Sequence, residues 1–438
     1  MKKPQKPEYK KIDPSPLFKG LEESLSFGTG VSWFDNLRRK KFSYLKEKKI
    51  DSLATFLGEK HGKFFSENAL LLSIVQTKPQ IKKVGVDDFK KYDQKLSGIL
   101  RISLDEADFV IQEEMEISGG ILSADLKSLK EKSDFLDGLK TAYMDSNRTV
   151  LENFIVAHGL YNAYLSIPDG LNAADPFLIQ IDLTAVDGFL PLNIYVRIGE
   201  SSQASLLIDV TSGQNENQPV LLSNLHVEIG DGGELDLLQT GQADQQALLF
   251  SHEKAIIGRD AVFNSFIIDN GGKLVDRTIS VDLYGRGGSA DVTCLYTPKN
   301  EQGYFYDTAQ NHHASDTTSD LLFKGVIDKS GYAWWKGNIL VEAGTKGANG
   351  YQANNNLMMD ETAKVESIPG LEIKTDDVRC SHGVTMGNVD DDQLFYLRSR
   401  GIDLEEAEKL IVEGFLTDTL KRVTKEEFHK EISEKIFT

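Results

Sequence analysis

A cysteine and a histidine two positions apart are the residues of this sequence best suited to metal chemistry. They are Cys380 and His382, within the stretch TDDVRCSHGVTMG at residues 375–387. In an extended segment, residues i and i+2 lie on one face, so the thiol and the imidazole would point the same way. Both are suitable ligands for iron, zinc or copper(I), but two ligands do not close a tetrahedral site. Further ligands must therefore come from elsewhere in the fold or from another chain. The alternative is a structural thiol, because free cysteines are often buried as small apolar residues.

The other candidates for chemistry are weaker. His312 and His313 are adjacent and close to Asp316, but neighbouring side chains on a strand point to opposite faces, which favours a structural or surface role. The sequence contains no G-x-x-x-x-G-K-[ST], no H-E-x-x-H, no G-x-S-x-G and no C-x-x-C motif. We therefore expect no nucleotide hydrolysis by this chain, and the missing motifs argue against an enzyme without excluding one.

The charge balance narrows the choice of partners and compartment. The 438 residues include 49 Lys and Arg against 67 Asp and Glu, a net charge of −18. This balance argues against a nucleic-acid or anionic-membrane surface. The N-terminus lacks the apolar core of a secretory signal, and no run approaches the length of a membrane helix. Two cysteines, Cys294 and Cys380, make no disulfide framework. We therefore predict a soluble cytoplasmic protein that binds neither nucleic acid nor membrane.

Repeated strands must position these side chains. From about residue 153 to 359 the sequence alternates apolar and polar residues in short runs that end in Gly, Asp or Asn. Four turn glycines, at positions 199, 230, 258 and 285, are spaced 31, 28 and 27 residues apart. Recurrence at this interval indicates a solenoid, because one coil cannot bury its inner face alone. We expect glycine at the corners because it adopts positive φ without steric cost. A β-sandwich or jelly roll is the competing architecture, but few Asn-Gly or Asp-Gly hairpin turns are present.

Helical segments flank this region. Residues 32–50 predict an amphipathic helix, residues 99–117 suggest strands, and residues 126–144 suggest a helix. Beyond the strands, helices are expected at 391–402, 403–423 and 425–437. We therefore divide the chain into an N-terminal helical and mixed region at 1–150, a β-helix core at 151–385 and a C-terminal helical region at 386–438.

Long segments of the sequence resemble the SufB/SufD family of iron–sulfur cluster assembly scaffold proteins. The segments are LLFKGVIDKSGYAWWKGNILVEAGTKGANGYQANNNLMM at 321–359, AKVESIPGLEIKTDDVRCSHGVTMGNVDDDQLFYLRSRGI at 363–402 and EAEKLIVEGFL at 406–416. Residues 153–170 are similar to the entry of that family's β-helix. CSHG followed by DQLFYLRSRGI resembles the SufD branch more than the SufB branch.

The resemblance implies a mainly β protein, with a right-handed parallel β-helix core and helical N- and C-terminal regions. It implies a heterodimer with a SufB-like chain through the β-helices, a homodimer also being possible, and docking of the SufC ATPase on the C-terminal helices. It also implies that a transient Fe–S cluster assembles at the partner interface, with His382 as the first choice of ligand and Cys380 as the second. The residues expected to dock SufC are Leu394, Phe395, Tyr396, Arg398, Arg400 and Gly401, with Phe415 and Leu416 behind them.

Three alternatives stay open at the level of the sequence. The first is a SufB-like homodimeric scaffold. A β-helix carbohydrate-active enzyme would need clustered carboxylates on one solenoid face and usually a secretion signal. A metal-free structural solenoid would be indifferent to replacement of Cys380 and His382.

Overall fold

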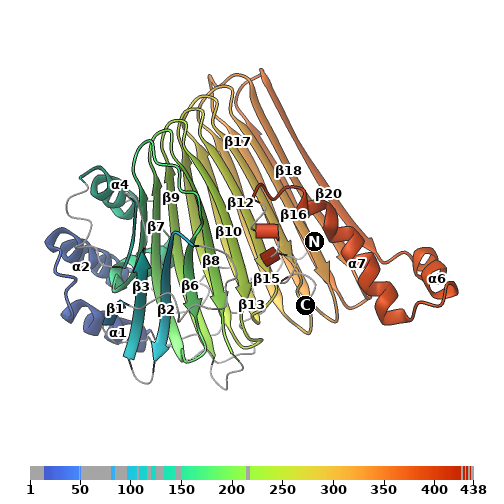
Figure 1. Cartoon of the computed structure of the whole chain (residues 1–438), viewed down its shortest axis with the longest axis horizontal. Coiled ribbons are helices and arrows are strands. Elements are labelled where there is room, and N and C mark those ends of the chain that lie inside the picture. Colours follow the sequence, from blue (N-terminus) through green and yellow to red (C-terminus); the bar gives the residue numbers. More distant parts are fainter. Residues whose placement is uncertain are drawn as a thin grey trace, which may run out of the picture.

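Two long β-sheets that face each other dominate the computed structural model (Figure 1). The residues that the structure describes are 14–48, 50, 80–83, 96–105, 108–115, 120–124, 133–144, 149–213 and 218–425, with 428, 429, 431, 432 and 435. Successive strands alternate between the two sheets from β5 onward, and each pairs in parallel with the strand two steps along the chain. This is the winding of a parallel β-solenoid, so the predicted fold class is confirmed.

The first sheet has 11 described strands. Its order is β1 (Gln80–Lys83), β3 (Asp108–Met115), β2 (Gly98–Asp105), β6 (Phe177–Asp182), β8 (Gln203–Thr211), β10 (Glu234–Gln242), β12 (Val262–Asp269), β14 (Ser289–Tyr296), β16 (Thr318–Ile327), β18 (Ala348–Met358) and β20 (Val378–Asn388). The second sheet has nine described strands. Its order is β19 (Lys364–Ile373), β17 (Tyr332–Val341), β15 (Gly303–His312), β13 (Leu274–Leu283), β11 (Leu248–Ile257), β9 (Pro219–Ile229), β7 (Gly188–Ile198), β5 (Tyr161–Ile167) and β4 (Ile121–Ser123).

Alternation along each strand builds the core. On β13, for example, Val275, Ile279 and Val281 point inward and are almost fully buried, while Ser280 points outward. Parallel pairing in register stacks equivalent inward positions, and one continuous apolar cluster therefore runs along the solenoid. Strands before residue 150 join both sheets, so the region predicted as helical and mixed also supplies the first strands.

The corner glycines are explained by crowding and not by positive φ. The glycines at 199, 230, 258 and 285 do not have positive φ, so the expected reason for them is wrong. A Cβ on Gly285 would lie 1.9 Å from the backbone nitrogen of Arg259 in the preceding coil. The coils therefore stack so closely at this corner that only a residue without a side chain fits.

Four helices are described before β5, in the N-terminal region. They are α1 (Ser15–Ser26), α2 (Ser32–Glu47), α4 (Ser133–Met144) and α5 (Val150–His158). The predicted apolar stripe of α2 is confirmed, because Phe34, Leu37 and Leu45 are buried. A capping box of Thr149 and Glu152 starts α5, which packs on the outer face of the second sheet. Residues 126–132 of the predicted helix at 126–144 lie outside the described residues.

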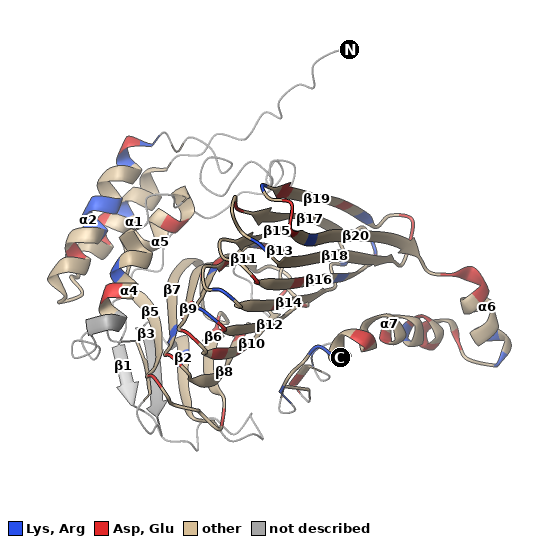
Figure 2. Cartoon of the chain, turned by 90° about the horizontal axis from the view of Figure 1, so that it is seen from above, with Lys and Arg blue, Asp and Glu red and all other residues tan. Residues whose placement is uncertain are grey.

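The C-terminal region begins directly after β20. It contains α6 (Asp391–Ser399) and α7 (Leu404–Leu420), and most of the third predicted helix at 425–437 lies outside the described residues. Asp390 and Asp403 cap the two helices by accepting hydrogen bonds from backbone N–H groups of the first turn. Figure 2 shows α6 projecting past the last strands, while α7 runs back across the first sheet. Among the helices that the structure describes, none is long and apolar enough to cross a membrane.

Candidate functional site

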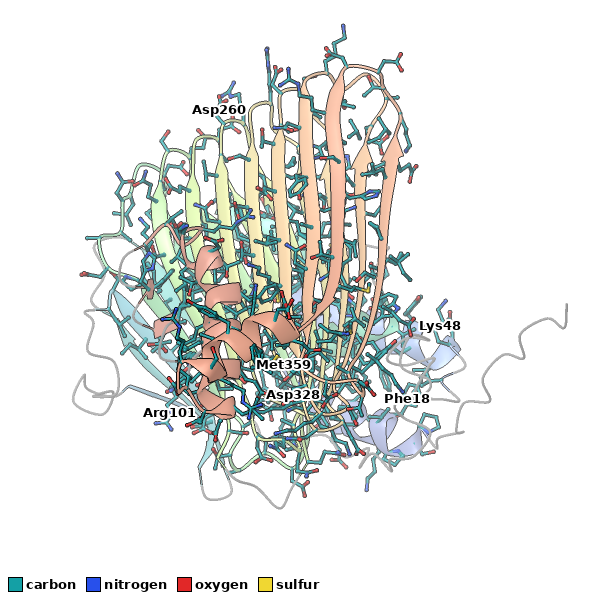
Figure 3. All side chains as sticks on the ribbon, turned by 90° about the vertical axis from the view of Figure 1, so that its right-hand side faces the viewer. Phe18, Lys48, Arg101, Asp260, Asp328 and Met359 are labelled. Carbon is teal, nitrogen blue, oxygen red and sulfur yellow. The ribbon has the colours of Figure 1, made fainter. Side chains whose placement is uncertain are left out.

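The solenoid ends in a coil whose inner face is uncovered. β20 and β19 are the outermost described strands of their sheets, and no other described strand pairs with their free edges. Figure 3 looks onto this end of the molecule. The inward positions of these strands include Leu371, Ile373 and Met386, whose exposed fractions are 40%, 37% and 45%. Equivalent positions in earlier coils are buried, and these positions are exposed because none of the described strands forms a further coil on top of them.

Cys380 and His382 both lie on the inner face of the open end. Cys380 pairs with Gly350 of β18, and His382 pairs with Gln352. Gly350 and Gln352 are buried and face the solenoid interior, so their partners on β20 face the same way. The extended backbone expected for this segment is present, and it places the thiol and the imidazole on one face of one edge strand.

The thiol of Cys380 is half-buried in an apolar corner. It packs with Val378 against a small cluster that contains Ile339 and Val341. Burial raises the pKa of the Cys380 thiol, and a hydrogen bond with the backbone of Gly350 acts in the opposite direction. The thiol is therefore protonated near neutral pH, and a bound cation would have to displace its proton.

The imidazole of His382 is exposed, and none of the hydrogen bonds found in the described part of the chain involves it. Within that same part, no group of three or more His, Cys, Asp or Glu side chains could hold a metal ion. The described residues thus offer two soft-to-intermediate ligands on an open surface, and these two alone do not complete a four-coordinate site.

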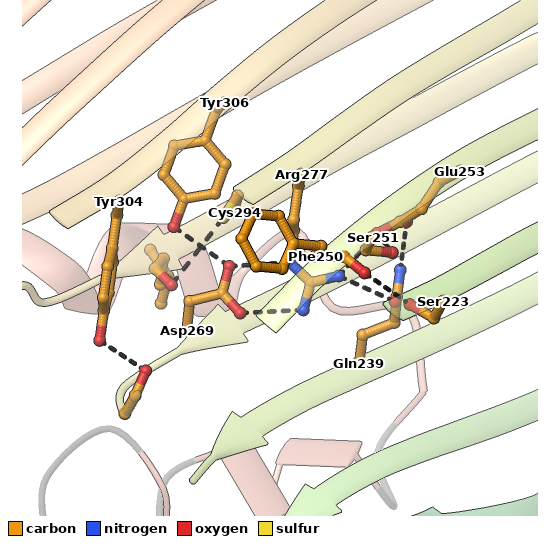
Figure 4. Close-up of polar contacts among 12 residues, drawn as sticks. Ser223, Gln239, Phe250, Ser251, Glu253, Asp269, Arg277, Cys294, Tyr304 and Tyr306 are labelled. Carbon is orange, nitrogen blue, oxygen red and sulfur yellow. Dashed lines mark hydrogen bonds and ion pairs between the residues drawn. The ribbon is translucent and has the colours of Figure 1, made fainter. Parts of the chain in front are cut away.

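The second cysteine, Cys294, lies in a different environment. It points inward from β14 and is fully buried, and burial raises its pKa well above the usual value. Figure 4 shows it beside a buried ionic cluster, in which the Arg277 guanidinium contacts Asp269 at 2.8 Å and Glu253 at 2.6 Å. Tyr306 donates a further hydrogen bond to Asp269 at 3.1 Å. This thiol is enclosed by neighbouring coils on both sides, so it is not accessible from the surface.

Sequence reasoning missed this ionic cluster, although one signal was present. Arg277 stands between Val275 and Ile279 in the alternating pattern of its strand, where an apolar residue is expected. A charged residue at an inward position requires buried partners of opposite charge. The strand pattern can therefore indicate that an ionic cluster exists, but not which carboxylates complete it.

The two adjacent histidines take opposite faces, as predicted. His312 is fully buried inside the solenoid, where its Nδ1 lies 2.8 Å from Thr317 Oγ1 and its Nε2 lies 2.9 Å from Ser319 Oγ. His313 points outward, contacts Asp282 at 3.0 Å and stacks on Tyr284. The pair therefore does not form one metal site.

The residues expected to dock a partner differ in their exposure to solvent. α6 buries none of its side chains, and Phe395 and Tyr396 are 74% and 57% exposed. Arg400 covers Tyr396, with its Nη2 donating to the tyrosine hydroxyl at 3.0 Å. Leu416, in contrast, is 1% exposed and packs on the outer face of the first sheet. The intermediate positions are Leu394 and Phe415, and the exposed ones also include Arg398 and Gly401.

Fold and site together define a class of protein. The chain is a parallel β-solenoid that presents a thiol and an imidazole at an open end, with helices attached beside that end. A family model described as "SUF system FeS cluster assembly, SufBD core domain" matches residues 183–415. Because this match covers more than half of the chain, the chain belongs to the SufBD family.

Relatives with recorded names agree with this membership. The iron–sulfur cluster assembly protein SufD of Escherichia coli K12 is 32% identical over 265 residues, which are 59% of this chain and 62% of that protein. SufD of Bacillus subtilis 168 is 26% identical over 335 residues, 74% of each chain. A SufBD family protein of Mycobacterium tuberculosis H37Rv is 29% identical over 249 residues, 55% of this chain and 62% of that protein. The resemblance to the SufD branch is therefore confirmed, and the chain spans about 62% of the length of the mycobacterial relative.

Proposed function

We propose that this chain is a SufD-like, non-catalytic subunit of an iron–sulfur cluster assembly scaffold, which pairs with a SufB-like chain and docks a SufC-like ATPase. The observation that carries the proposal is the open end of the solenoid, with Cys380 and His382 on its inner face. In this proposal residues 151–385 supply the scaffold and its interface, and residues 386–438 supply the ATPase-docking region. The cytoplasm is the compartment that fits two cysteines without a disulfide.

The open end supports pairing with a second β-solenoid. Edge strands carry unpaired backbone N–H and C=O groups, and natural proteins cover or blunt such edges. A partner whose last coil met β19 and β20 would continue both sheets and bury Leu371, Ile373 and Met386. A partner with its own thiolate or carboxylate at this face would complete the ligand set around Cys380 and His382. A second copy of this chain is the competing occupant of the same end.

The chemistry assigned to this chain is ligation of iron and sulfide as cargo. The Cys380 thiol must lose its proton to bind iron, and its half-buried position keeps it protonated until a cation arrives. The imidazole of His382 is exposed on the same face and can bind through a neutral ring nitrogen. A single imidazole ligand binds iron less strongly than a thiolate cage, which suits a cluster that is assembled and then passed on.

The C-terminal helices support docking of an ATPase. Phe395 and Tyr396 present aromatic surface on a helix in which no residue is buried. Aromatic and arginine side chains are enriched in protein interfaces, and Arg398 and Arg400 follow the aromatic pair within the next four residues. Because no nucleotide-binding motif is present in this sequence, the ATP-dependent step belongs to the partner.

The test is co-expression with SufB-like and SufC-like chains and anaerobic purification, followed by visible absorption. The variants are His382→Ala and Cys380→Ala, with Ser381→Ala as matched control, because Ser381 lies between them and faces outward. We expect all four proteins to form the complex, with iron–sulfur absorption reduced in His382→Ala and Cys380→Ala alone. Equal absorption in all four would show that neither residue is a ligand. Failure of the wild type to bind either partner would refute the scaffold role, and a stable dimer of this chain alone would favour the homodimer.

A further inference from the structure

A polar cleft lies on the outer face of the second sheet, beside the N-terminal end of α5. Its volume is about 270 Å³, and three neighbouring strands, β9, β11 and β13, line it. Because Leu225, Ala255 and Ile279 of these strands point into the solenoid, the residues next to them point outward and form the floor of the cleft. The first turn of α5 forms the wall through Glu152. The cleft is therefore separate from the open end and from the C-terminal helices.

A ladder of asparagines leads into this cleft. Asn162, Asn193 and Asn224 occupy paired outward positions on β5, β7 and β9. The Nδ2 of Asn193 donates to Asn162 Oδ1 at 3.3 Å, and the Nδ2 of Asn224 donates to Asn193 Oδ1 at 3.2 Å. Each Oδ1 thus accepts a hydrogen bond from the next strand. The position after Asn224 in the ladder is His252 on β11, so the run of amides ends there.

The last amide oxygen of the ladder, Asn224 Oδ1, is buried and has no hydrogen-bond partner among the described residues. Asn224 is 4% exposed, and its Nδ2 faces β7 and the backbone carbonyl of Glu152, at 3.4 Å. Because the oxygen and the nitrogen of an amide lie on opposite sides of its carbon, the oxygen is turned towards β11 and the cleft. An unpaired buried acceptor destabilises a protein, so this oxygen favours a ligand that donates a hydrogen bond.

The side of the cleft next to α5 carries negative charge. The Oε2 of Glu152 lies 3.6 Å from His252 Nδ1, and the same carboxylate completes the capping box with the backbone N–H of Thr149. This carboxylate and the Asn224 oxygen both lie beside His252. A carboxylate and an amide oxygen together are suitable acceptors for a protonated amine.

The floor of the cleft carries positive charge. Lys254 points outward from β11 and pairs with Ser280 of β13. An ammonium and a hydroxyl are suitable donors for a carboxylate. Asp282, an acidic residue on the same floor, contacts His313 at 3.0 Å. A ligand that carried one charge only would therefore meet a residue of its own sign, either Glu152 or Lys254.

We propose that this cleft binds a small amino acid, whose ammonium group pairs with Glu152 and the Asn224 oxygen and whose carboxylate pairs with Lys254. Both charges of such a zwitterion meet a partner of opposite sign. The volume of the cleft is just below the range of pockets that hold drug-sized molecules, so it suits a ligand of this size. The ligand would contact α5 and β11 together and so stabilise their packing. Because the site needs no partner chain, its failure would leave the proposed scaffold role unchanged.

The test is titration of the full chain with L-alanine and with β-alanine, followed by saturation-transfer NMR of the ligand. Propionate and ethylamine are the matched probes, because each keeps only one of the two charges. The charge variants are Glu152→Gln and Lys254→Gln, and glutamine at position 152 can still complete the capping box. The matched control is Lys336→Gln, because Lys336 points outward from the same sheet but contacts Asp307, at 3.9 Å, outside the cleft.

We expect at least one of the two amino acids to bind equally to the wild type and to the control. Propionate and ethylamine should bind at least about tenfold more weakly, and each charge variant should weaken amino-acid binding by about tenfold, because a charge-assisted hydrogen bond is lost. The comparison with the single-charge probes needs only the wild type, so it holds even where a variant fails to fold. Propionate or ethylamine binding as tightly as the amino acid would overturn the proposal, as would equal amino-acid binding in all four proteins. No binding of either amino acid to the wild type would overturn it as well, and the cleft would then hold only solvent.

Discussion

The free energy of unfolding should depend on pH through one buried histidine, His312. Thr317 Oγ donates to the carbonyl of Ala314 at 3.0 Å, so it accepts a hydrogen bond from His312 Nδ1–H. Gln310 Nε2 donates to Ser319 Oγ at 2.7 Å, which leaves the serine hydroxyl to donate to His312 Nε2. The neutral imidazole therefore satisfies every partner, and a second ring proton would face a hydroxyl hydrogen.

The size of the effect follows from the shift in pKa. Burial, with a smaller effect from His313, lowers the pKa of His312 from the ordinary 6.5 to about 4. Above about pH 6.5 neither state binds the proton, and stability is complete. As the pH falls from there towards 4, only the unfolded chain binds it, so the free energy of unfolding decreases. The loss at pH 5 relative to pH 7 is about 2 kcal/mol, and it approaches about 3 kcal/mol below pH 4.

The assay is urea unfolding at pH 7 and pH 5 at constant ionic strength, for the wild type, His312→Gln and His312→Asn. Neither replacement can take up a proton, so both should lose about 2 kcal/mol less than the wild type between the two pH values. Their stabilities at pH 7 can differ from each other without affecting this comparison. Identical pH dependence in all three proteins would refute the reasoning, as would a His312 imidazole that titrates by NMR near its ordinary value.

Three further predictions concern packing and the open end. Arg277→Met should lower the free energy of unfolding by about 3–5 kcal/mol, measured by urea unfolding, because it leaves Asp269 buried without its cation. Gly350→Ala should cost about 1–3 kcal/mol in the same assay, because the new Cβ would lie 3.1 Å from Ile339 Cγ2. Leu371→Asp should leave the free energy of unfolding of the isolated chain within about 1 kcal/mol of the wild-type value, since this side chain is 40% exposed, and should abolish co-purification of the SufB-like chain. An unchanged complex with Leu371→Asp would place the interface elsewhere.

The repetitive part of the fold was predictable because its physical rule is local. Alternation of apolar and polar residues gives each strand one inward face, and glycines at 199, 230, 258 and 285 mark a recurring corner. The reason for those glycines was not predictable. Whether a glycine serves a positive φ or a close approach depends on the neighbouring coil, and Gly285 is required by the backbone of Arg259.

The candidate site was predictable in part for the same reason. Spacing alone placed Cys380 and His382 on one face, since that depends only on an extended backbone. Spacing did not distinguish the surroundings of the two cysteines, because burial depends on which coils lie beside each strand. Likewise, the sequence grouped Leu416 with Phe395, but only the packing of α7 on the sheet shows that the former is buried and the latter exposed.

The position of a strand along the solenoid decides whether its inward side chains can be reached by another molecule. Cys294 and Cys380 both point inward from strands of the same sheet, on β14 and β20. Later coils cover the first, so its thiol is enclosed and its pKa is raised well above the ordinary value. No described strand covers the second, so its thiol and the imidazole of His382 can be reached by another molecule. A stacked fold has such an uncovered inner face only at its ends, and in this chain that is where the two candidate ligands, Cys380 and His382, lie.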